Sequence, residues 1–234
     1  MSGLLYANEY SINDKIKIVI PTVGEIIDNE DAYFNIIYAI TATPYDMMVQ
    51  LDDAGIDFTK VSEFELFCLM FRQLIEADTS LVFGDLNLSR FRTAVNQQNG
   101  NVVLWNGDDI TIDMAVYDQI AKFIREMLFI TKNDKKPANE EARLYLIQKE
   151  RKRQKRSKNK KKKSQLENLI VSLVNTSEFP YNYQTVRDIS IYQFYASLHQ
   201  ITRKVRFDNT MIGCYAGTVK FDELSLEDRS WLQT

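Results

Sequence analysis

The sequence is poor in the residues that most often do chemistry. It contains one histidine and two cysteines among 234 residues. A single imidazole excludes a multi-histidine metal centre, and no GxSxG or comparable nucleophile context accompanies His199, so a Ser-His-Asp arrangement is not indicated. Cys68 and Cys214 are too far apart in the sequence to form a CxxC metal site, and two cysteines do not make a disulfide framework. We expect His199 to be a partly buried helix residue and Cys68 to be a buried, unreactive thiol.

Long apolar runs are also missing. No stretch reaches the roughly 18–20 residues that a membrane-spanning helix needs. The first residues, MSGLLYANEYSINDK, lack the cationic and apolar segments of a signal peptide. With 8 glycines and 4 prolines the chain is neither collagen-like nor loop-rich. We therefore expect a soluble, cytoplasmic protein that has no membrane partner.

Motifs that bind phosphate or metal are not present either. Neither a P-loop nor a GxGxxG sequence occurs. Two acidic clusters occur, Asp52, Asp53 and Asp57 in one and Asp108, Asp109 and Asp113 in the other. Such carboxylates can hold Mg²⁺ or transfer protons, but helix ends and turns explain these positions better. We predict no catalytic, cofactor-binding or metal-binding residues, and no enzyme activity.

What is present favours helices. Alternating β-branched residues predict a short strand over residues 15–20, and Asn106-Gly107 between strand-forming residues predicts a type I′ hairpin over about 101–113. Ser62 and Glu65 form a capping box at the start of a helix over about 62–77. Apolar spacing predicts the other helices, at about 31–42, 45–51 with Pro44 in its first turn, 113–130, 138 into the basic run, 166–174, 189–205 and 225–231. The fold class is thus α+β and predominantly helical.

The most informative stretch is KERKRQKRSKNKKKK, residues 149–163. It holds eleven of the 29 basic residues and one of the 32 acidic ones, which gives it a net charge of +10. The remaining 18 basic and 31 acidic residues give the rest of the chain a net charge of −13. We predict that the cations bind a partner or a nucleic acid; they are Lys149, Arg151, Lys152, Arg153, Lys155, Arg156, Lys158, Lys160, Lys161, Lys162 and Lys163.

This basic arm allows several interpretations. It can neutralise phosphates without sequence specificity, dock on an acidic protein, or fold back on the acidic body of this chain. It can equally be a solvated loop, which is the commonest role of a charge run. Like charges at helical spacing and the lack of apolar residues predict mobility over about 156–164. We divide the chain into a mainly helical region with the hairpin (1–130), a linker with the basic arm (131–165) and a helical C-terminal region (166–234).

Several phrases carry a resemblance to known proteins, among them IPTVGEI at 20–26, TPYDMMVQL at 43–51, GIDFT at 55–59, LVFGDL at 81–86, IYQF at 191–194 and GCYAGT at 213–218. The chain resembles morphogenesis proteins of tailed bacteriophages and prophages of Gram-positive bacteria, and is similar in character to tail assembly chaperones. That resemblance implies a non-enzymatic, cytoplasmic assembly factor whose partner is the tape measure protein or the tail tube protein. It implies no residue-level binding motif.

Three functions remain open on the sequence, with an uncharacterised enzyme as the last alternative. The first is a tail assembly chaperone that acts by protein–protein contact. The second is a nucleic-acid-binding accessory protein that uses the basic arm, and the third is a structural virion component such as a connector or baseplate part. The sequence leaves the oligomeric state open.

Overall fold

The computed structural model describes residues 3–97, 100–133, 135–157 and 163–232. The described helices, in chain order, are α1 (Val23–Asp28), α2 (Glu30–Thr41), α3 (Met48–Asp53), α4 (Glu63–Ile75), α5 (Ser80–Phe83), α6 (Met114–Met127), α7 (Glu140–Ser157), α8 (Gln165–Val174) and α9 (Ile191–Tyr215). The strands are β1 (Glu9–Ser11), β2 (Lys17–Val19), β3 (Arg92–Val95), β4 (Val102–Trp105) and β5 (Thr111–Ile112). The predicted α+β, mainly helical fold class is confirmed.

Two small antiparallel sheets flank the helices. β1 pairs with β2, with Tyr10 opposite Ile18. The second sheet has the order β3-β4-β5, and Leu104 in β4 lies opposite Ile112. The predicted hairpin is therefore present, but the type I′ turn is wrong. The loop has five residues, because the Asn106 side chain accepts hydrogen bonds from the amides of Asp108 and Ile110 at 3.0 and 3.1 Å.

Local capping signals place several helices correctly. The Ser62 hydroxyl accepts a hydrogen bond from the Glu65 amide at 3.2 Å, and the Glu65 carboxylate accepts from the Ser62 amide at 2.7 Å. Asp113 caps α6 by accepting a hydrogen bond from the Val116 amide. Both satisfy amides that a helix start leaves without intrahelical partners.

Other expected boundaries are wrong. Pro44 lies outside α3, which begins at Met48, because Thr43 and Asp46 form their own capped turn before it. The segment 226–229 forms a 3-10 helix rather than an α-helix. The predictions from the sequence contain no counterpart of α1, α5, β1 or β3, which all have six residues or fewer. The start of α1 nevertheless has a local signal, the capping box formed by Thr22 and Glu25. The C-terminal helix runs ten residues beyond its predicted end at Val205.

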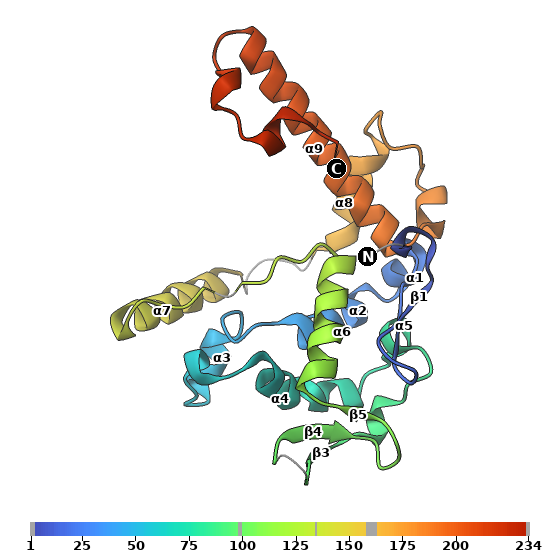
Figure 1. Cartoon of the computed structure of the whole chain (residues 1–234), viewed down its shortest axis with the longest axis vertical. Helices are drawn as coiled ribbons and strands as arrows, with labels where there is room; N and C mark the ends of the chain where they lie inside the picture. The colour runs from blue at the N-terminus through green and yellow to red at the C-terminus, as the bar shows by residue number, and fades with distance from the viewer. Residues whose placement is uncertain (1–2, 98–99, 134, 158–162, 233–234) are drawn as a thin grey trace.

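One hydrophobic core joins the N-terminal and C-terminal parts of the chain. Phe67 stacks on Tyr117 with ring centroids 4.7 Å apart, between α4 and α6. The same buried cluster includes Leu166 and Ile170 of α8 and Phe194 of α9. Figure 1 shows α6 along the middle of the molecule, with α7 reaching out to one side near α3 and with α9 projecting away from the body. The predicted division into three regions stays a prediction.

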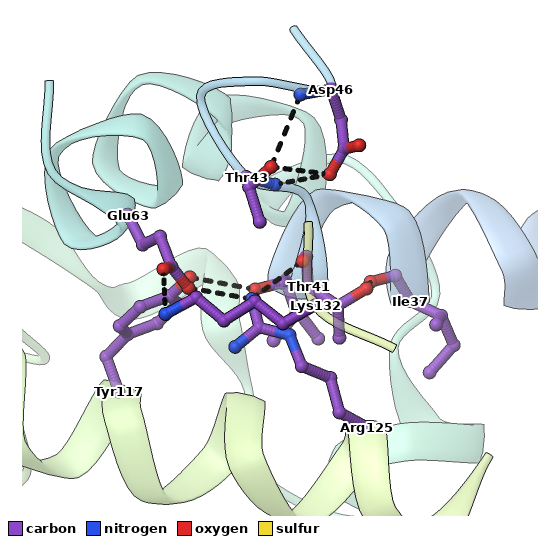
Figure 2. Close-up of polar contacts among 9 residues, drawn as sticks. Ile37, Thr41, Thr43, Asp46, Glu63, Tyr117, Arg125 and Lys132 are labelled. Atoms are coloured by element: carbon purple, nitrogen blue, oxygen red, sulfur yellow. Dashed lines mark hydrogen bonds and ion pairs between the residues drawn. The ribbon is translucent and has the colours of Figure 1, made fainter. Parts of the chain in front are cut away.

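A polar junction ties three helices together inside this core (Figure 2). The Arg125 guanidinium, on α6, donates hydrogen bonds to the Thr41 carbonyl at 2.7 Å and to the Glu63 carboxylate at 2.8 Å. Thr41 is the last residue of α2, and Glu63 is the first residue of α4. Lys132 forms a second ion pair with Glu63. The side chains of Arg125 and Glu63 are only 12% and 19% exposed, so the pair is largely shielded from water.

The Tyr117 hydroxyl reinforces the junction. It donates a hydrogen bond to the Ile40 carbonyl at 3.1 Å, and burial raises the pKa of this phenol above its usual range. Arg125 and Tyr117 thereby satisfy two of the carbonyl groups that the C-terminal end of α2 leaves free.

We predict that Arg125→Met lowers the free energy of unfolding by about 2–3 kcal/mol, because it removes one of the two ion-pair partners of the shielded Glu63 carboxylate and the donor that bonds the Thr41 carbonyl. Chemical denaturation measures the change. The matched control is Arg72→Met on α4, whose pair with Glu76 is exposed on both sides, and which should change the stability by less than about 0.5 kcal/mol. Equal losses in the two variants would contradict the prediction.

Candidate functional site

The basic arm divides into a helix and a segment outside the described residues. Helix α7 contains Lys149, Arg151, Lys152, Arg153, Lys155 and Arg156 of the predicted binding residues, and the described chain resumes at Lys163, which is exposed. Lys158, Lys160, Lys161 and Lys162 lie outside the described residues, as does much of the 156–164 stretch for which mobility is predicted. The role of all eleven cations in binding stays a prediction.

Part of the arm is docked on the acidic body. Arg151 donates one hydrogen bond to Asp53 at 2.6 Å and another to Asp52 at 2.8 Å, both at the end of α3. These bonds, the one to Asp53 first, raise the pKa of the guanidinium. Two helical turns earlier, Arg143 lies 3.7 Å from Asp57, and Ile147 between the two arginines is buried. The first acidic cluster therefore holds α7 in place.

Asp57 is also bound by its own neighbours. Its carboxylate accepts hydrogen bonds from the hydroxyl and the amide of Thr59 at 2.8 and 3.0 Å. These two bonds are the main cause of its lowered pKa, with Arg143 adding a smaller effect. The Asp57 carboxylate thus caps the 3-10 turn that follows it, as helix-end residues commonly do.

The second acidic cluster has structural partners too. Asp109 pairs with Lys15, whose ammonium group lowers the pKa of that carboxyl. Asp113 caps α6, and the Asp108 carbonyl accepts a hydrogen bond from the Trp105 indole at 2.9 Å. In the ranges that the structure describes, no group of three or more His, Cys, Asp or Glu side chains is arranged to hold a metal ion.

The two residues singled out for possible reactivity have ordinary surroundings. Cys68 is half-buried, and desolvation raises its pKa to about 11, so its thiol stays protonated near neutral pH. His199 lies on α9 with its ring stacked on Phe129 at 5.3 Å. It is exposed rather than partly buried as expected, because α9 leaves the body near this point.

Four other cations of α7 line one side of an open hollow of about 830 Å³. Lys149, Lys152, Arg153 and Arg156 line it from α7. Tyr45, in the turn before α3, and Met48, the first residue of α3, line it from the other side. Arg153 pairs with Glu150 at 2.6 Å. The other three cations have no carboxylate partner among the residues described, so the hollow carries excess positive charge.

Helix α9 presents a second surface, which the sequence reasoning missed. Eight positions recur at alternating intervals of three and four residues: Ile191, Phe194, Leu198, Ile201, Val205, Asp208, Ile212 and Tyr215. Such spacing gives a helix one continuous seam, the pattern of a coiled-coil strand. We call these eight positions the α9 seam. The polar residues Arg206, Asp208, Asn209 and Thr210 hide the extension of the seam past Val205 in the sequence.

The α9 seam is buried at one end and open at the other. Ile191 and Phe194 are fully buried, and Leu198 and Ile201 pack against the core. Val205, Ile212 and Tyr215 are 44%, 64% and 89% exposed. None of the residues 195–226 and 228–232 is buried, although this stretch includes several large apolar side chains.

The C-terminal segment covers the face of α9 turned away from the seam. Arg206 pairs with Asp228 at 3.0 Å. Gln200 donates a hydrogen bond to the Trp231 carbonyl at 3.0 Å, and Arg203 donates to the Ser230 carbonyl at 3.3 Å. Figure 1 shows this segment returning along α9. The seam thus remains open while the opposite face is occupied.

Comparisons with known proteins give one match. Residues 158–234, a third of the chain, match a protein-family model described as the YomV second domain. YomV belongs to a Bacillus phage or prophage region, so the match suggests a phage origin. It agrees with the phage part of the resemblance but does not bear on tail assembly or chaperone activity. Neither the search of curated proteins nor that of solved structures finds a match.

The described helices also bear on membrane association. None of them has both the length and the apolar character that a membrane span requires.

We predict that Arg151→Ala loosens α7, because it removes both bonds to Asp52 and Asp53. Amide hydrogen exchange over residues 140–157 should accelerate roughly threefold at low salt. Lys155→Ala is the matched control, since Lys155 is exposed on the same helix and should change the exchange little. Unchanged exchange in Arg151→Ala would show that the Arg151 pairs do not hold α7, and that apolar packing and the Arg143–Asp57 pair suffice.

Proposed function

We propose that the protein is a phage-encoded tail assembly factor that binds a helical segment of the tape measure protein through the exposed half of the α9 seam. One observation carries this proposal. The seam continues for about three turns beyond the point where the body stops covering it, and it still presents Val205, Ile212 and Tyr215.

The 3-4 spacing favours a helix as the occupant. Side chains at these intervals interlock with the ridges of another helix, whereas a strand or a flat surface fills them poorly. A tape measure protein is a long helical polymer, and before assembly it exposes apolar seams that need to be covered. Binding of an amphipathic helix to an apolar helix face is a common recognition mode.

The charge balance fits binding by apolar contact. Residues 195–232 contain five basic and five acidic residues, so this part of the chain neither strongly attracts nor repels a charged partner. The part of the basic arm up to Arg156 lies elsewhere, on α7. The match to the phage-associated YomV domain covers α8, α9 and the C-terminal segment, and thus includes the seam.

Co-expression of the tagged chain with the tape measure protein, and separately with the tail tube protein, tests the proposal. We expect the tape measure protein to be recovered with the chain. The double substitution Val205→Glu and Ile212→Glu should reduce its recovery roughly tenfold or more. Binding would bury both new carboxylates against the partner helix, which is unfavourable. Both positions are exposed in the free protein, so its unfolding transition should not change.

Leu69→Glu is the matched control, because Leu69 is an apolar residue on α4 with 59% exposure and lies outside the seam. It should leave the recovery unchanged. The chain should also be missing from mature particles analysed by mass spectrometry, as befits an assembly factor. Recovery of neither the tape measure protein nor the tail tube protein would contradict the proposal. So would a chain that associates with itself and that the double substitution dissociates.

A further inference from the structure

The hollow between α3 and α7 combines features that the proposed function does not use. Its volume is about 830 Å³, and its wall on the side of α3 consists of Tyr45 and Met48. Its wall on the side of α7 includes Lys149, Lys152 and Arg156. An aromatic ring and a row of cations therefore face the same open space.

The cations lie in a regular row. Lys149, Lys152, Arg153 and Arg156 are spaced i, i+3, i+4 and i+7, which places them on one face of the helix. At 1.5 Å per residue the row is about 10 Å long. A row of this length faces two or more successive phosphates of an extended strand, and each contact releases counterions.

The docking of α7 keeps this row in position. Arg151 binds Asp52 and Asp53 at the end of α3, and Ile147 is buried against the core. Arg153 is partly neutralised by Glu150, at 2.6 and 2.8 Å. The acidic cluster thus neutralises Arg151 but leaves Lys149, Lys152 and Arg156 available to bind an anion.

The ring of Tyr45 is also held in place. It packs edge-on against Phe58, with the ring centroids 6.0 Å apart and the planes at 86°. A fixed aromatic ring beside cations provides a platform on which an unpaired base can stack while its phosphates contact the row. The bases of a duplex are stacked inside the helix and cannot reach such a ring without flipping out.

From this geometry we propose that the hollow between Tyr45 and the cations of α7 binds single-stranded nucleic acid. Lys149, Lys152 and Arg156 contact the phosphates, and Tyr45 stacks on a base. An acidic protein segment would satisfy the cations but would make no use of the ring. The proposal does not depend on the tape measure interaction, because the α9 seam lies on a different element.

The test uses the full chain and a short fluorescein-labelled oligodeoxythymidylate, with binding followed by anisotropy over a series of salt concentrations. Lys152→Ala should weaken binding severalfold and flatten the salt dependence by about 0.7 in log–log slope, the value for one phosphate contact on a single strand. Lys155→Ala is the matched control. It removes the same charge from α7 but lies outside the hollow, so both quantities should change much less.

Substitutions of Tyr45 separate the contribution of base stacking to the affinity from that of charge. Tyr45→Leu should weaken binding about tenfold without changing the salt slope, and Tyr45→Phe, which retains the ring, should bind like the parent. A thermal melt followed by circular dichroism checks that the variants fold. If Tyr45→Leu does not fold, competition by duplex of the same length decides, because weak competition by the duplex supports the single-strand site.

Three results would overturn the proposal. The first is no binding of the oligonucleotide at low salt. The second is an equal loss of affinity in Lys152→Ala and Lys155→Ala, which would indicate diffuse attraction by the whole arm. The third is displacement of the oligonucleotide by poly-glutamate as effectively as by unlabelled oligonucleotide, which would indicate a site for an acidic protein.

Discussion

The placement of both candidate surfaces depends on the junction that Arg125 makes with Glu63 and the end of α2. A guanidinium can bond a helix-terminal carbonyl and a carboxylate at once because it carries several N–H donors in one rigid plane. Here the Nη2 group of Arg125 donates both bonds and thereby fixes α6 against α2 and α4. The chain then passes through Lys132, which is held by the same carboxylate, on its way to α7. Just past the end of α6, Phe129 stacks on Tyr192 and His199 of α9. The junction therefore sets where the basic helix and the projecting helix leave the body.

The position of α7 follows from the uneven distribution of charge along the chain. A body with excess negative charge would attract the basic run at any point, but nonspecific attraction does not define a position. Arg151 and Arg143 convert that attraction into defined pairs with Asp52, Asp53 and Asp57. Exposed pairs of this kind stabilise a fold only slightly. Their larger effect is geometric, since they determine which cations of α7 are paired with carboxylates and which remain exposed.

The sequence alone could predict features that depend on neighbouring residues. The Ser62–Glu65 capping box needs only four consecutive residues, and the structure contains it. The hairpin could also be predicted, but the conformation of its loop could not. The Asn106 side chain accepts hydrogen bonds from backbone amides, and these bonds compete with the two-residue turn. The Arg151 pairs join residues about a hundred positions apart. Sequence patterns identify both partners of such a contact as charged, but they contain no information on which carboxylate meets which cation.

Asp208 is the one charged residue of the α9 seam, and it affects what the seam can bind. Lys204 pairs with it at 2.8 Å, so in the free protein the carboxylate is neutralised from within its own helix. A partner helix that packs along the seam has to cover this pair or offer a polar group opposite it. A polar residue at a core position of a coiled coil lowers the affinity but fixes the register, because only one alignment satisfies it. An uninterrupted apolar seam would accept many helices in many registers and would favour aggregation. With Asp208 between Val205 and Ile212, we expect the seam to prefer a helix with a basic or amide side chain at one defined position.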